Sequence, residues 1–292
     1  MPHAPRPVRI ALAATGVIAT ASLLWTAATP TDVYAIDVFG ALRQPGEAAA
    51  IIAHRGDRSL APENTMPALE LAMDELAYVE TDVRLTRDGV PVLFHDTDLE
   101  RVAGREGRVE DRTFAELARL DVGRWYSDEF AGERIPTLEA FLAELAERDD
   151  ARALVELKAD WSPAQVRLVV DLIERHRLRG RVVLQSFSIE TLQSMQRVAP
   201  TTPRIMLIRE LPADPVPLAE WLGVIGFGTT AASVTARPGA VDAAHAAGIA
   251  VLCYTLNTQD TWAQVSELGV DGIITDQPSD LDAWIAATAP GT

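Results

Sequence analysis

The fold is decided by one short stretch of the chain, residues 50–96. It contains AIIAHRG at residues 50–56, PENT at 62–65, YVETD at 78–82 and FHD at 94–96. Two runs with strand character, Ala50–His54 and Tyr78–Arg84, flank a helical pattern over Met66–Glu75. A strand, a helix and a second parallel strand form a crossover unit, and the polar ends of its strands meet at one edge of the sheet. We therefore expect the remaining chain to extend this sheet and to complete a site at that edge.

The length and composition are those of a globular protein with one large core or two small ones. Its 292 residues are 48% hydrophobic and 23% charged, and the formal net charge is −16. This composition excludes a disordered chain and a multi-span membrane protein. The negative charge would repel a phosphate backbone, so no nucleic-acid partner is expected. The single cysteine, Cys253, allows no intrachain disulfide and is expected to lie in the core.

Residues 1–35 have the pattern of an export signal. Two arginines, Arg6 and Arg9, precede an uncharged apolar run over residues 10–28. The run is long for a signal peptide and just long enough to span a bilayer. A cleaved signal and an uncleaved anchor are equally open. Cleavage could follow Ala28 or Ala35, and an anchor would hold the protein to a membrane through residues 10–28. We expect an exported protein (secreted, periplasmic or extracellular) or a membrane-anchored one, with residues 36–49 as a leader into the domain.

From Ala50 onward, apolar runs alternate with helical patterns, as in a parallel sheet with crossover helices. The runs predicted to be strands are Ala50–His54, Tyr78–Arg84, Ala153–Lys158, Arg181–Phe187, Arg204–Ile208, Leu222–Gly226, Ala250–Leu256 and Gly272–Thr275. The predicted helices are Met66–Glu75, Leu138–Glu147, Pro163–His176, Ile189–Val198, Pro238–Ala247, Gln259–Leu268 and Leu281–Ala287, with a short turn of helix around Pro215–Trp221. This alternation predicts an α/β fold, a (β/α)8 TIM-type barrel over residues 50–288.

A hairpin is expected directly after the second strand. Asp88-Gly89 lies between two apolar runs, and this dipeptide is a strong signal for a tight turn between antiparallel strands. A two-residue loop centred there would pair residues whose numbers sum to about 177 and would place His95 opposite Asp82. The segment 98–136 then becomes an insertion before the next helix, which we interpret as a lid or small subdomain at the barrel mouth.

Three acidic residues at the ends of predicted strands are candidate metal ligands. Glu80 and Asp82 lie two apart on one strand, so their side chains share a face, and Glu156 ends the next barrel strand beside Lys158. Carboxylates facing one another repel unless a cation or protons lie between them. Three hard oxygen ligands suit Ca²⁺ or Mg²⁺ better than zinc. The alternative is a structural ion-pair network with nearby basic side chains.

Two histidines converge on the same acids. His54 ends the first strand and His95 ends the hairpin, and each can act as a general acid or base near neutral pH. One histidine at a strand end is usually a satisfied core residue, but two beside a carboxylate cluster favour a catalytic pair. His176 and His245 lie on predicted helices and are expected to have no role in the chemistry.

Taken together, these motifs resemble the glycerophosphodiester phosphodiesterase family. The resemblance runs in register from about Ala50 to Trp284 and rests on several separate motifs: His54-Arg55-Gly56, Pro62-Glu63-Asn64-Thr65, Glu80-x-Asp82, Asp88-Gly89-Val90-Pro91-Val92, His95-Asp96, Glu156-Leu157-Lys158 and Gly269-Val270-Asp271-Gly272-Ile273-Ile274-Thr275-Asp276-Gln277-Pro278. It implies a TIM-type barrel that hydrolyses a small glycerophosphodiester to glycerol 3-phosphate and an alcohol with a divalent cation, Ca²⁺ or Mg²⁺.

The resemblance also implies roles for individual residues. By position, Glu80, Asp82 and Glu156 resemble the metal ligands, and His54 and His95 the general acid–base pair. Basic and polar residues at other strand ends are candidates for binding the substrate; they are Arg55, Lys158, Tyr254 and Asn257.

Two departures from the family pattern concern the expected pocket wall. Arg101 is followed by Val102-Ala103 where the family commonly has two threonines, and Tyr254 stands where it often has tryptophan. Both bear on substrate choice. A related barrel phospholipase that acts on membrane lipids (phospholipase D-like or phosphoinositide-cleaving) is the alternative function, and a non-catalytic binding barrel is a further one. The non-catalytic binding barrel is disfavoured because every metal and histidine motif is intact.

Overall fold

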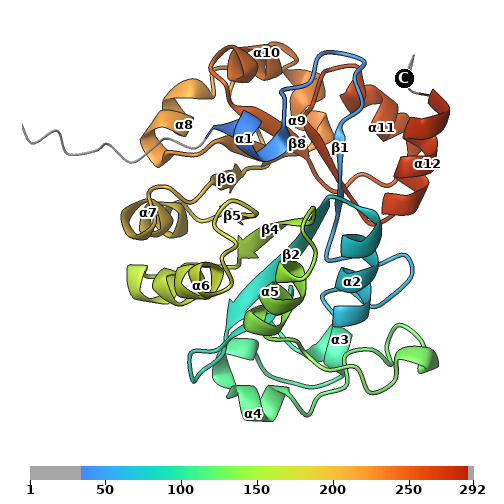
Figure 1. Cartoon of the computed structure of the whole chain (residues 1–292), viewed down its shortest axis with the longest axis vertical. Coiled ribbons are helices and arrows are strands. Elements are labelled where there is room, and N and C mark those ends of the chain that lie inside the picture. The colour runs from blue at the N-terminus through green and yellow to red at the C-terminus, as the bar shows by residue number, and fades with distance from the viewer. Residues whose placement is uncertain (1–33, 289–292) are drawn as a thin grey trace, which may run out of the picture. The chain divides into compact units, whose positions relative to one another are not determined.

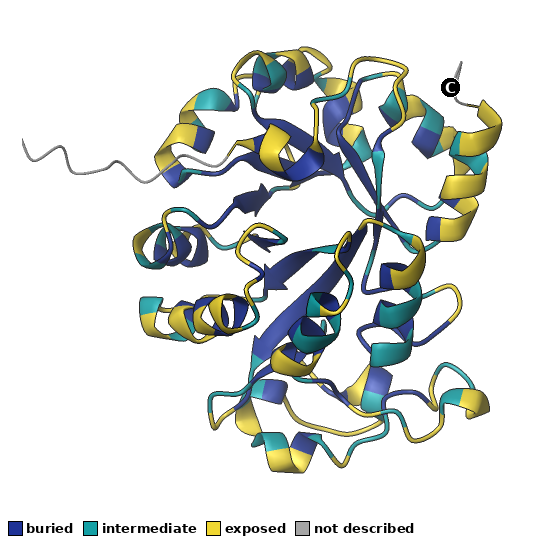
Figure 2. Ribbon diagram, in the orientation of Figure 1, coloured by how far each residue is buried: buried dark blue, intermediate teal, exposed yellow. Residues whose placement is uncertain are grey.

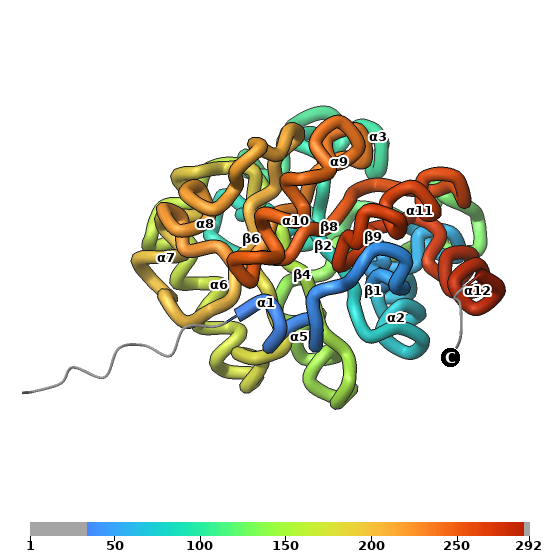
Figure 3. Tube along the Cα trace, turned by 90° about the horizontal axis from the view of Figure 1, so that it is seen from above, coloured from blue at the N-terminus to red at the C-terminus, as the bar shows by residue number. Residues whose placement is uncertain are grey.

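The computed structural model describes residues 34–288, and its core is a closed barrel of eight parallel strands (Figure 1). In barrel order the strands are β1 (Ala50–Ala53), β2 (Tyr78–Leu85), β4 (Arg152–Leu157), β5 (Val182–Ser186), β6 (Arg204–Leu207), β7 (Gly226–Thr229), β8 (Ala250–Cys253) and β9 (Gly272–Thr275). The barrel closes because β1 pairs in parallel with both β2 and β9. From above, β1 and β9 lie side by side inside a ring of helices (Figure 3). The predicted TIM-type barrel is confirmed.

Helices connect the strands and cover the outside of the barrel. They are α1 (Ala35–Phe39), α2 (Met66–Glu75), α3 (Glu100–Ala103), α4 (Phe114–Leu117), α5 (Leu138–Ala146), α6 (Pro163–Arg175), α7 (Ile189–Val198), α8 (Val216–Leu222), α9 (Ala231–Ala236), α10 (Gly239–Ala246), α11 (Gln259–Ser266) and α12 (Pro278–Thr288). Two short 3-10 turns lie at Val109–Asp111 and Asp128–Phe130. No helix of the described part of the chain is long and apolar enough to cross a membrane.

The barrel interior is divided into an apolar floor and a polar mouth. Side chains alternate between the two faces of a strand, so every second residue points inward. Near the N-terminal strand ends these residues are apolar and form one buried cluster; it includes Ile52, Leu154, Val183, Ile205, Leu252 and Ile274. Two residues further along β2 and β4 the interior holds Asp82 and Glu156, which are register partners. Figure 2 shows the strands largely buried, with intermediate residues at the start of β1, and the outer helix faces exposed.

Helix α1 closes the floor of the barrel. Ala35, Val38 and Phe39 are buried in the same cluster as the inward residues of the strands. The ring of Phe39 stacks on that of Tyr78 at 5.7 Å, and the Tyr78 hydroxyl donates a hydrogen bond to the Val38 carbonyl (2.7 Å). The segment interpreted as a leader, 36–49, therefore begins with part of the core. The apolar run 10–28 lies outside the described residues.

The hairpin after β2 forms, but its predicted register is wrong by one residue. Strand β3 (Pro91–Leu93) pairs antiparallel with β2, and the partners Val83 and Leu93 sum to 176. The loop has three residues rather than two, because Gly89 adopts φ 80° and adds a left-handed position after the turn. As a result Phe94, not His95, is bonded to Asp82: the Phe94 N–H donates to the Asp82 carbonyl (3.0 Å).

The segment 98–136 packs on the hairpin around a small core of its own. That core contains Val92, Phe94, Leu99, Val102, Val109, Leu117, Val122 and Ile135. Val102 is buried there and Ala103 packs against it, so the expectation that these residues form the pocket wall is wrong. The segment reaches the loop after β1 through Tyr126, whose hydroxyl donates to the Ser59 carbonyl (2.8 Å).

One barrel strand was predicted in the wrong place. The run Leu222–Gly226 was expected to be a strand, but Leu222 ends α8 and the strand is β7, Gly226–Thr229. Its two glycines have low strand propensity, but neighbouring strands approach them so closely that a side chain would collide. A Cβ on Gly228 would lie 2.6 Å from the Leu207 side chain, and one on Gly226 would lie 2.9 Å from the Ala250 carbonyl oxygen.

Candidate active site

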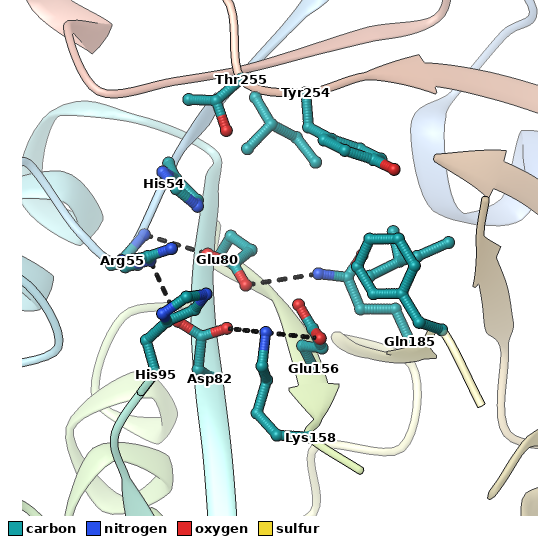
Figure 4. A pocket seen from close by; sticks show the side chains of 13 residues that line it. His54, Arg55, Glu80, Asp82, His95, Glu156, Lys158, Gln185, Tyr254 and Thr255 are labelled. Atoms are coloured by element: carbon teal, nitrogen blue, oxygen red, sulfur yellow. Dashed lines mark hydrogen bonds and ion pairs between the residues drawn. The ribbon is translucent and has the colours of Figure 1, made fainter. Parts of the chain in front are cut away.

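Three carboxylates from neighbouring strands meet at the barrel mouth (Figure 4). Glu80 and Asp82 come from β2 and Glu156 from β4, all are buried, and each offers an oxygen atom within 4.8 Å of the others. Two cations border the cluster. Lys158 pairs with Glu156 (2.8 Å) and Asp82 (3.4 Å), and Arg55 pairs with Asp82 (3.1 Å).

The cluster has more negative charge than its cations balance, and the pKa values reflect this. Burial raises the pKa of Glu80 well above its usual value, and the charges of Asp82 and Glu156 raise it further. Burial and the charge of Asp82 raise the pKa of Glu156 to about 7. Burial also opposes ionisation of Asp82, but Arg55 and Lys158 outweigh it and hold the pKa of Asp82 well below its usual value. Protons or a cation must therefore relieve the repulsion among the three groups.

The donor set fits a hard divalent cation. Three carboxylates supply only oxygen atoms, as Ca²⁺ and Mg²⁺ prefer. The Gln185 side chain lies beside them on β5: its Nε2 donates to Glu80 Oε1 (3.4 Å), and its buried Oε1 has no hydrogen-bond partner in the described structure. An unsatisfied buried oxygen next to three carboxylates is a further oxygen donor for such an ion. In the part of the chain that the structure describes, no histidine nitrogen or cysteine sulfur joins the cluster, which argues against zinc.

His54 is held at the mouth by an aspartate from the last strand. Its Nδ1 lies 2.6 Å from Asp276 Oδ1. Burial opposes ionisation of Asp276, but its bond to His54 and the charges around it lower its pKa to about 2. An ionised carboxylate can only accept, so Nδ1 carries the proton and Nε2 is the free nitrogen. Asn257 fixes Asp276 in turn, donating from Nδ2 to Oδ2 (2.8 Å) and accepting from the Asp276 N–H (2.9 Å).

His95 is held in the same way by its neighbour in sequence. Its Nδ1 lies 2.7 Å from Asp96 Oδ1, and Arg101 Nε donates to Asp96 Oδ2 (2.7 Å). Burial opposes ionisation of Asp96, but the hydrogen bonds from Arg101 and His95 lower its pKa to about 2. Asp96 is thus ionised and accepts the Nδ1 proton, and Nε2 of His95 is the free nitrogen. Figure 4 shows both histidines on the same side of the carboxylate cluster.

The loop after β1 needs its particular sequence to carry these groups. Gly56 has φ 82°, and a Cβ there would lie 2.5 Å from the carbonyl carbon of Ala68 in α2. This close approach turns the chain back over the mouth, where the Arg55 N–H donates to Glu80 Oε2 (3.0 Å). Further on, the Asn64 side chain donates to Asp82 Oδ2 (3.0 Å) and accepts from the Thr81 hydroxyl (2.7 Å).

A pocket of about 160 Å³ opens among these side chains. Its lining is His54, Arg55, Glu80, Asp82, His95, Glu156, Lys158, Gln185, Phe187, Leu207, Tyr254, Thr255 and Ile274. The charged groups occupy one side and the apolar groups the other. On the apolar side Phe187 and Tyr254 meet edge to face, with their ring centroids 5.7 Å apart. The pocket therefore offers an anion-binding half and an aromatic half.

Comparison with known families agrees with this geometry. Residues 54–280 match the model of the glycerophosphoryl diester phosphodiesterase family. The chain belongs to that family. Enzymes of this name are similar along most of its length. The glycerophosphodiester phosphodiesterase of Caldanaerobacter subterraneus is 33% identical over 79% of this chain and 95% of its own, and that of Bacillus altitudinis is 31% identical over 78% and 94%. The chain is thus a phosphoric diester hydrolase.

Solved structures of the family share the fold. The glycerophosphodiester phosphodiesterase of Agrobacterium tumefaciens is 31% identical, with a TM-score of 0.71 over 81% of this chain and all of its own. An Oleispira antarctica phosphodiesterase, 29% identical, matches with a TM-score of 0.76 over 81% of this chain and 96% of its own. That structure holds the product sn-glycerol-3-phosphate.

For this phosphodiesterase family member, the predicted site residues are brought together with one exception. His54, His95, the three acids, Arg55, Lys158 and Tyr254 all line the pocket. Asn257, predicted to bind substrate, lies behind Asp276 and does not line it. Sequence reasoning missed Gln185 and Thr255 on the wall. It also missed that Glu63, within the motif Pro62-Glu63-Asn64-Thr65, binds Arg101, because Arg101 lies 38 residues further along the chain.

Proposed function

We propose that the protein hydrolyses small glycerophosphodiesters to glycerol 3-phosphate and an alcohol, with a divalent cation and with His54 and His95 as the acid–base pair. One observation carries the proposal. Two histidines whose Nδ1 atoms are each bound to a carboxylate share one pocket with a buried cluster of three carboxylates. Family membership supports the substrate class, and the product held by the Oleispira antarctica phosphodiesterase supports the glycerol phosphate half.

Glu80, Asp82 and Glu156 would hold the cation, with Gln185 beside them. When bound, a cation of this kind polarises phosphoryl oxygens and favours loss of a proton from a nearby hydroxyl. Arg55 and Lys158 are the fixed positive charges of the pocket, and they offset the negative charge of the diester. Ca²⁺ and Mg²⁺ both suit these ligands.

The two histidines divide the proton transfers. One accepts a proton at Nε2 from the attacking hydroxyl, which resemblance to the family identifies as the glycerol 2-hydroxyl. The other must be an imidazolium, protonated at both ring nitrogens, and it donates the proton on Nε2 to the oxygen of the departing alcohol. Asp276 and Asp96 keep each ring in the tautomer and orientation that these transfers need. The oxygen of the attacking hydroxyl bonds to phosphorus as the bond from phosphorus to the alcohol oxygen breaks, which leaves a cyclic phosphate. In the second stage the oxygen of a water molecule bonds to phosphorus, the ring bond to the 2-oxygen breaks to give glycerol 3-phosphate, and the two histidines exchange roles.

The pocket size favours a small substrate over a membrane lipid. At about 160 Å³ it is smaller than the ~300–1,000 Å³ typical of drug-sized ligands. The polar half suits the glycerol phosphate group, and the alcohol would leave along the aromatic half. Tyr254 and Phe187 are the side chains that would contact it.

The direct test is release of glycerol 3-phosphate from glycerophosphocholine, with and without a chelator. We expect activity to disappear in chelator and to return with Ca²⁺ or Mg²⁺. The variant Glu156→Gln keeps the shape of a ligand and removes its charge, so it should require more metal and turn over more slowly. Activity that persists in chelator, or in Glu156→Gln without added metal, would rule out the metal role.

The histidine roles are tested by single variants and by a change of leaving group. We expect His54→Ala and His95→Ala each to lower kcat by about 10²- to 10⁴-fold. A p-nitrophenyl leaving group needs no proton, so only the variant that lacks the general acid should recover on such a substrate. Full activity in either variant on glycerophosphocholine would remove that histidine from the pair.

We also propose that residues 1–35 direct export. The charge and hydropathy of residues 1–28 support this. Ala35 is buried in the barrel floor, so processing after Ala28 would leave α1 complete, whereas processing after Ala35 would remove a core residue. Sequencing the N-terminus of the mature protein distinguishes the two sites. A mature chain in the cytoplasm with Met1 intact would contradict export.

A further inference from the structure

A single side chain holds the His95–Asp96 pair from outside the pocket. Arg101, on α3, donates from Nε to Asp96 Oδ2 (2.7 Å). The other oxygen of that carboxylate takes the His95 Nδ1 proton (2.7 Å). Among the described residues, Asp96 has no other side-chain or backbone partner. Arg101 does not line the pocket itself.

The His54–Asp276 pair is held differently. Asn257 makes two hydrogen bonds to Asp276, one with the side chain and one with the backbone, and Arg58 adds an ion pair at 3.2 Å. Loss of any one of these contacts leaves others in place. Apart from His95 itself, the Asp96 carboxylate therefore has one described partner, Arg101, whereas the Asp276 carboxylate has two, Asn257 and Arg58.

Arg101 is itself firmly placed. Its two terminal nitrogens form a bidentate ion pair with Glu63, at 2.7 and 3.0 Å. Glu63 has only 2% of its side chain exposed and is anchored independently by Arg55 (2.8 Å) and Arg58 (3.1 Å). The Arg101 guanidinium also stacks over the Trp125 ring, with its central carbon 5.3 Å from the ring centroid. The three guanidinium nitrogens each donate one of these hydrogen bonds in a planar fork that lysine cannot reproduce, so this geometry requires arginine.

We propose that Arg101 is a positioning residue for His95 and that the insertion 98–136 serves to present it. The inference rests on the proposed function, because it matters only if His95 exchanges protons. Both Arg101 and the Trp125 that supports it belong to the insertion, which packs on the outer side of the hairpin that carries His95. The insertion thus acts on the chemistry through Asp96, and none of residues 98–136 lines the pocket.

The kinetic test is a double-mutant cycle on glycerophosphocholine at saturating metal. We expect Arg101→Gln to lower kcat by about 10- to 100-fold, as is usual when a group that orients an active-site residue is lost, while KM stays nearly constant. In a His95→Ala background the same substitution should change kcat by no more than about twofold, since its route of action is gone. Arg124→Gln is the matched control, because the Arg124 side chain is 66% exposed on the same insertion and, within residues 34–288, forms ion pairs only with Asp121 and Asp128.

A spectroscopic readout separates positioning from general damage. In ¹⁵N spectra of the histidine rings, wild-type His95 should be a single Nδ1-protonated tautomer. Arg101→Gln should give a mixture for His95 and leave His54 unchanged. The melting temperature checks folding, and Trp125→Leu should give a smaller change in the same direction.

The outcomes distinguish this inference from the proposed function. Full activity of His95→Ala removes the acid–base role and the inference with it. Loss of activity in His95→Ala together with wild-type kcat in Arg101→Gln overturns the inference alone. A rise in KM with unchanged kcat would instead mean that Arg101 binds substrate, and losses that add in the double variant would mean that it does not act through His95.

Discussion

At the scale of single residues, burial sets the charge of the pocket histidines. Burial lowers the pKa of His54 and of His95 below 6.5, and the attraction of neighbouring acids does not compensate. Both rings are then mostly neutral in the substrate-free protein at pH 7, so the histidine that acts as base is ready to accept a proton. The histidine that acts as acid must first bind a proton at Nε2. We expect kcat/KM to fall on acidification with an inflection below pH 6.5. The variant Asp276→Asn removes a bond that raises the pKa of His54, so any inflection due to His54 should move lower still. An inflection above pH 6.5 would contradict this assignment.

Two glycines with the same backbone conformation should respond differently to one added methyl group. Gly56 and Gly89 have φ 82° and 80°, but a Cβ at Gly56 would collide with Ala68, whereas one at Gly89 has nothing within 4 Å. Gly89→Ala should cost about 1 kcal/mol from backbone strain alone. Gly56→Ala should cost clearly more, since the loop must also move away from α2. Denaturant unfolding of both variants measures the difference, and equal losses would show that the contact with α2 is unimportant.

Contacts within the site could be predicted where the two partners lie close together in the sequence, and could not where they lie far apart. Glu80 and Asp82 lie two residues apart, as do Glu156 and Lys158, so the side chains of each pair point to the same face of their strand. Glu63 binds Arg101 across 38 residues and His54 binds Asp276 across 222. Spacing carries no information about such partners, because they meet only after the strands have been placed in the barrel.

At the scale of elements, apolar runs predicted strands well and failed where packing overrides propensity. The valines and isoleucines of β1, β4 and β9 mark buried strands. Strand β7 begins Gly-Phe-Gly, and its glycines are explained only by neighbours that the sequence does not reveal. The hairpin was located by Asp88-Gly89, but its register depended on loop length, and a three-residue loop shifts every pair by one.

Helix α1 should contribute to stability out of proportion to its length. Phe39 is 4% exposed and stacks on Tyr78, whereas Ile36 on the same helix is 53% exposed. We expect Phe39→Ala to reduce the free energy of unfolding by about 3–5 kcal/mol. Ile36→Ala, the matched control, should change it by about 0.5 kcal/mol or less. If both variants unfold at the same denaturant concentration as wild type, α1 does not hold the barrel floor.

At the scale of the whole molecule, the metal ligands make stability depend on pH. The folded-state pKa of Glu156 is raised to about 7 from 4.5, so the folded protein binds this proton more tightly than the unfolded chain. Without metal, this group therefore costs stability as the pH rises from 4.5 to 7, because the unfolded chain releases its proton first.

The matching measurement is thermal melting in chelator and in excess Ca²⁺ or Mg²⁺. In chelator, Glu156→Gln should gain stability relative to wild type as the pH rises from about 5 to 7. Added cation should raise the melting temperature of wild type more at about pH 7.5 than at about pH 5, since protons compete for the same oxygens. No shift with either cation at any pH would contradict the metal site independently of activity.

The pairing of β1 with β9 has a consequence for when the enzyme becomes active during its synthesis. The first strand carries His54, and the aspartate that orients it follows the ninth, 222 residues later. A nascent chain that has emerged as far as α11 already contains both histidines, the three acids and Lys158. It still has an open sheet and an unoriented His54. We therefore expect hydrolysis to begin only once β9 has paired with β1 and nearly the whole barrel has been made.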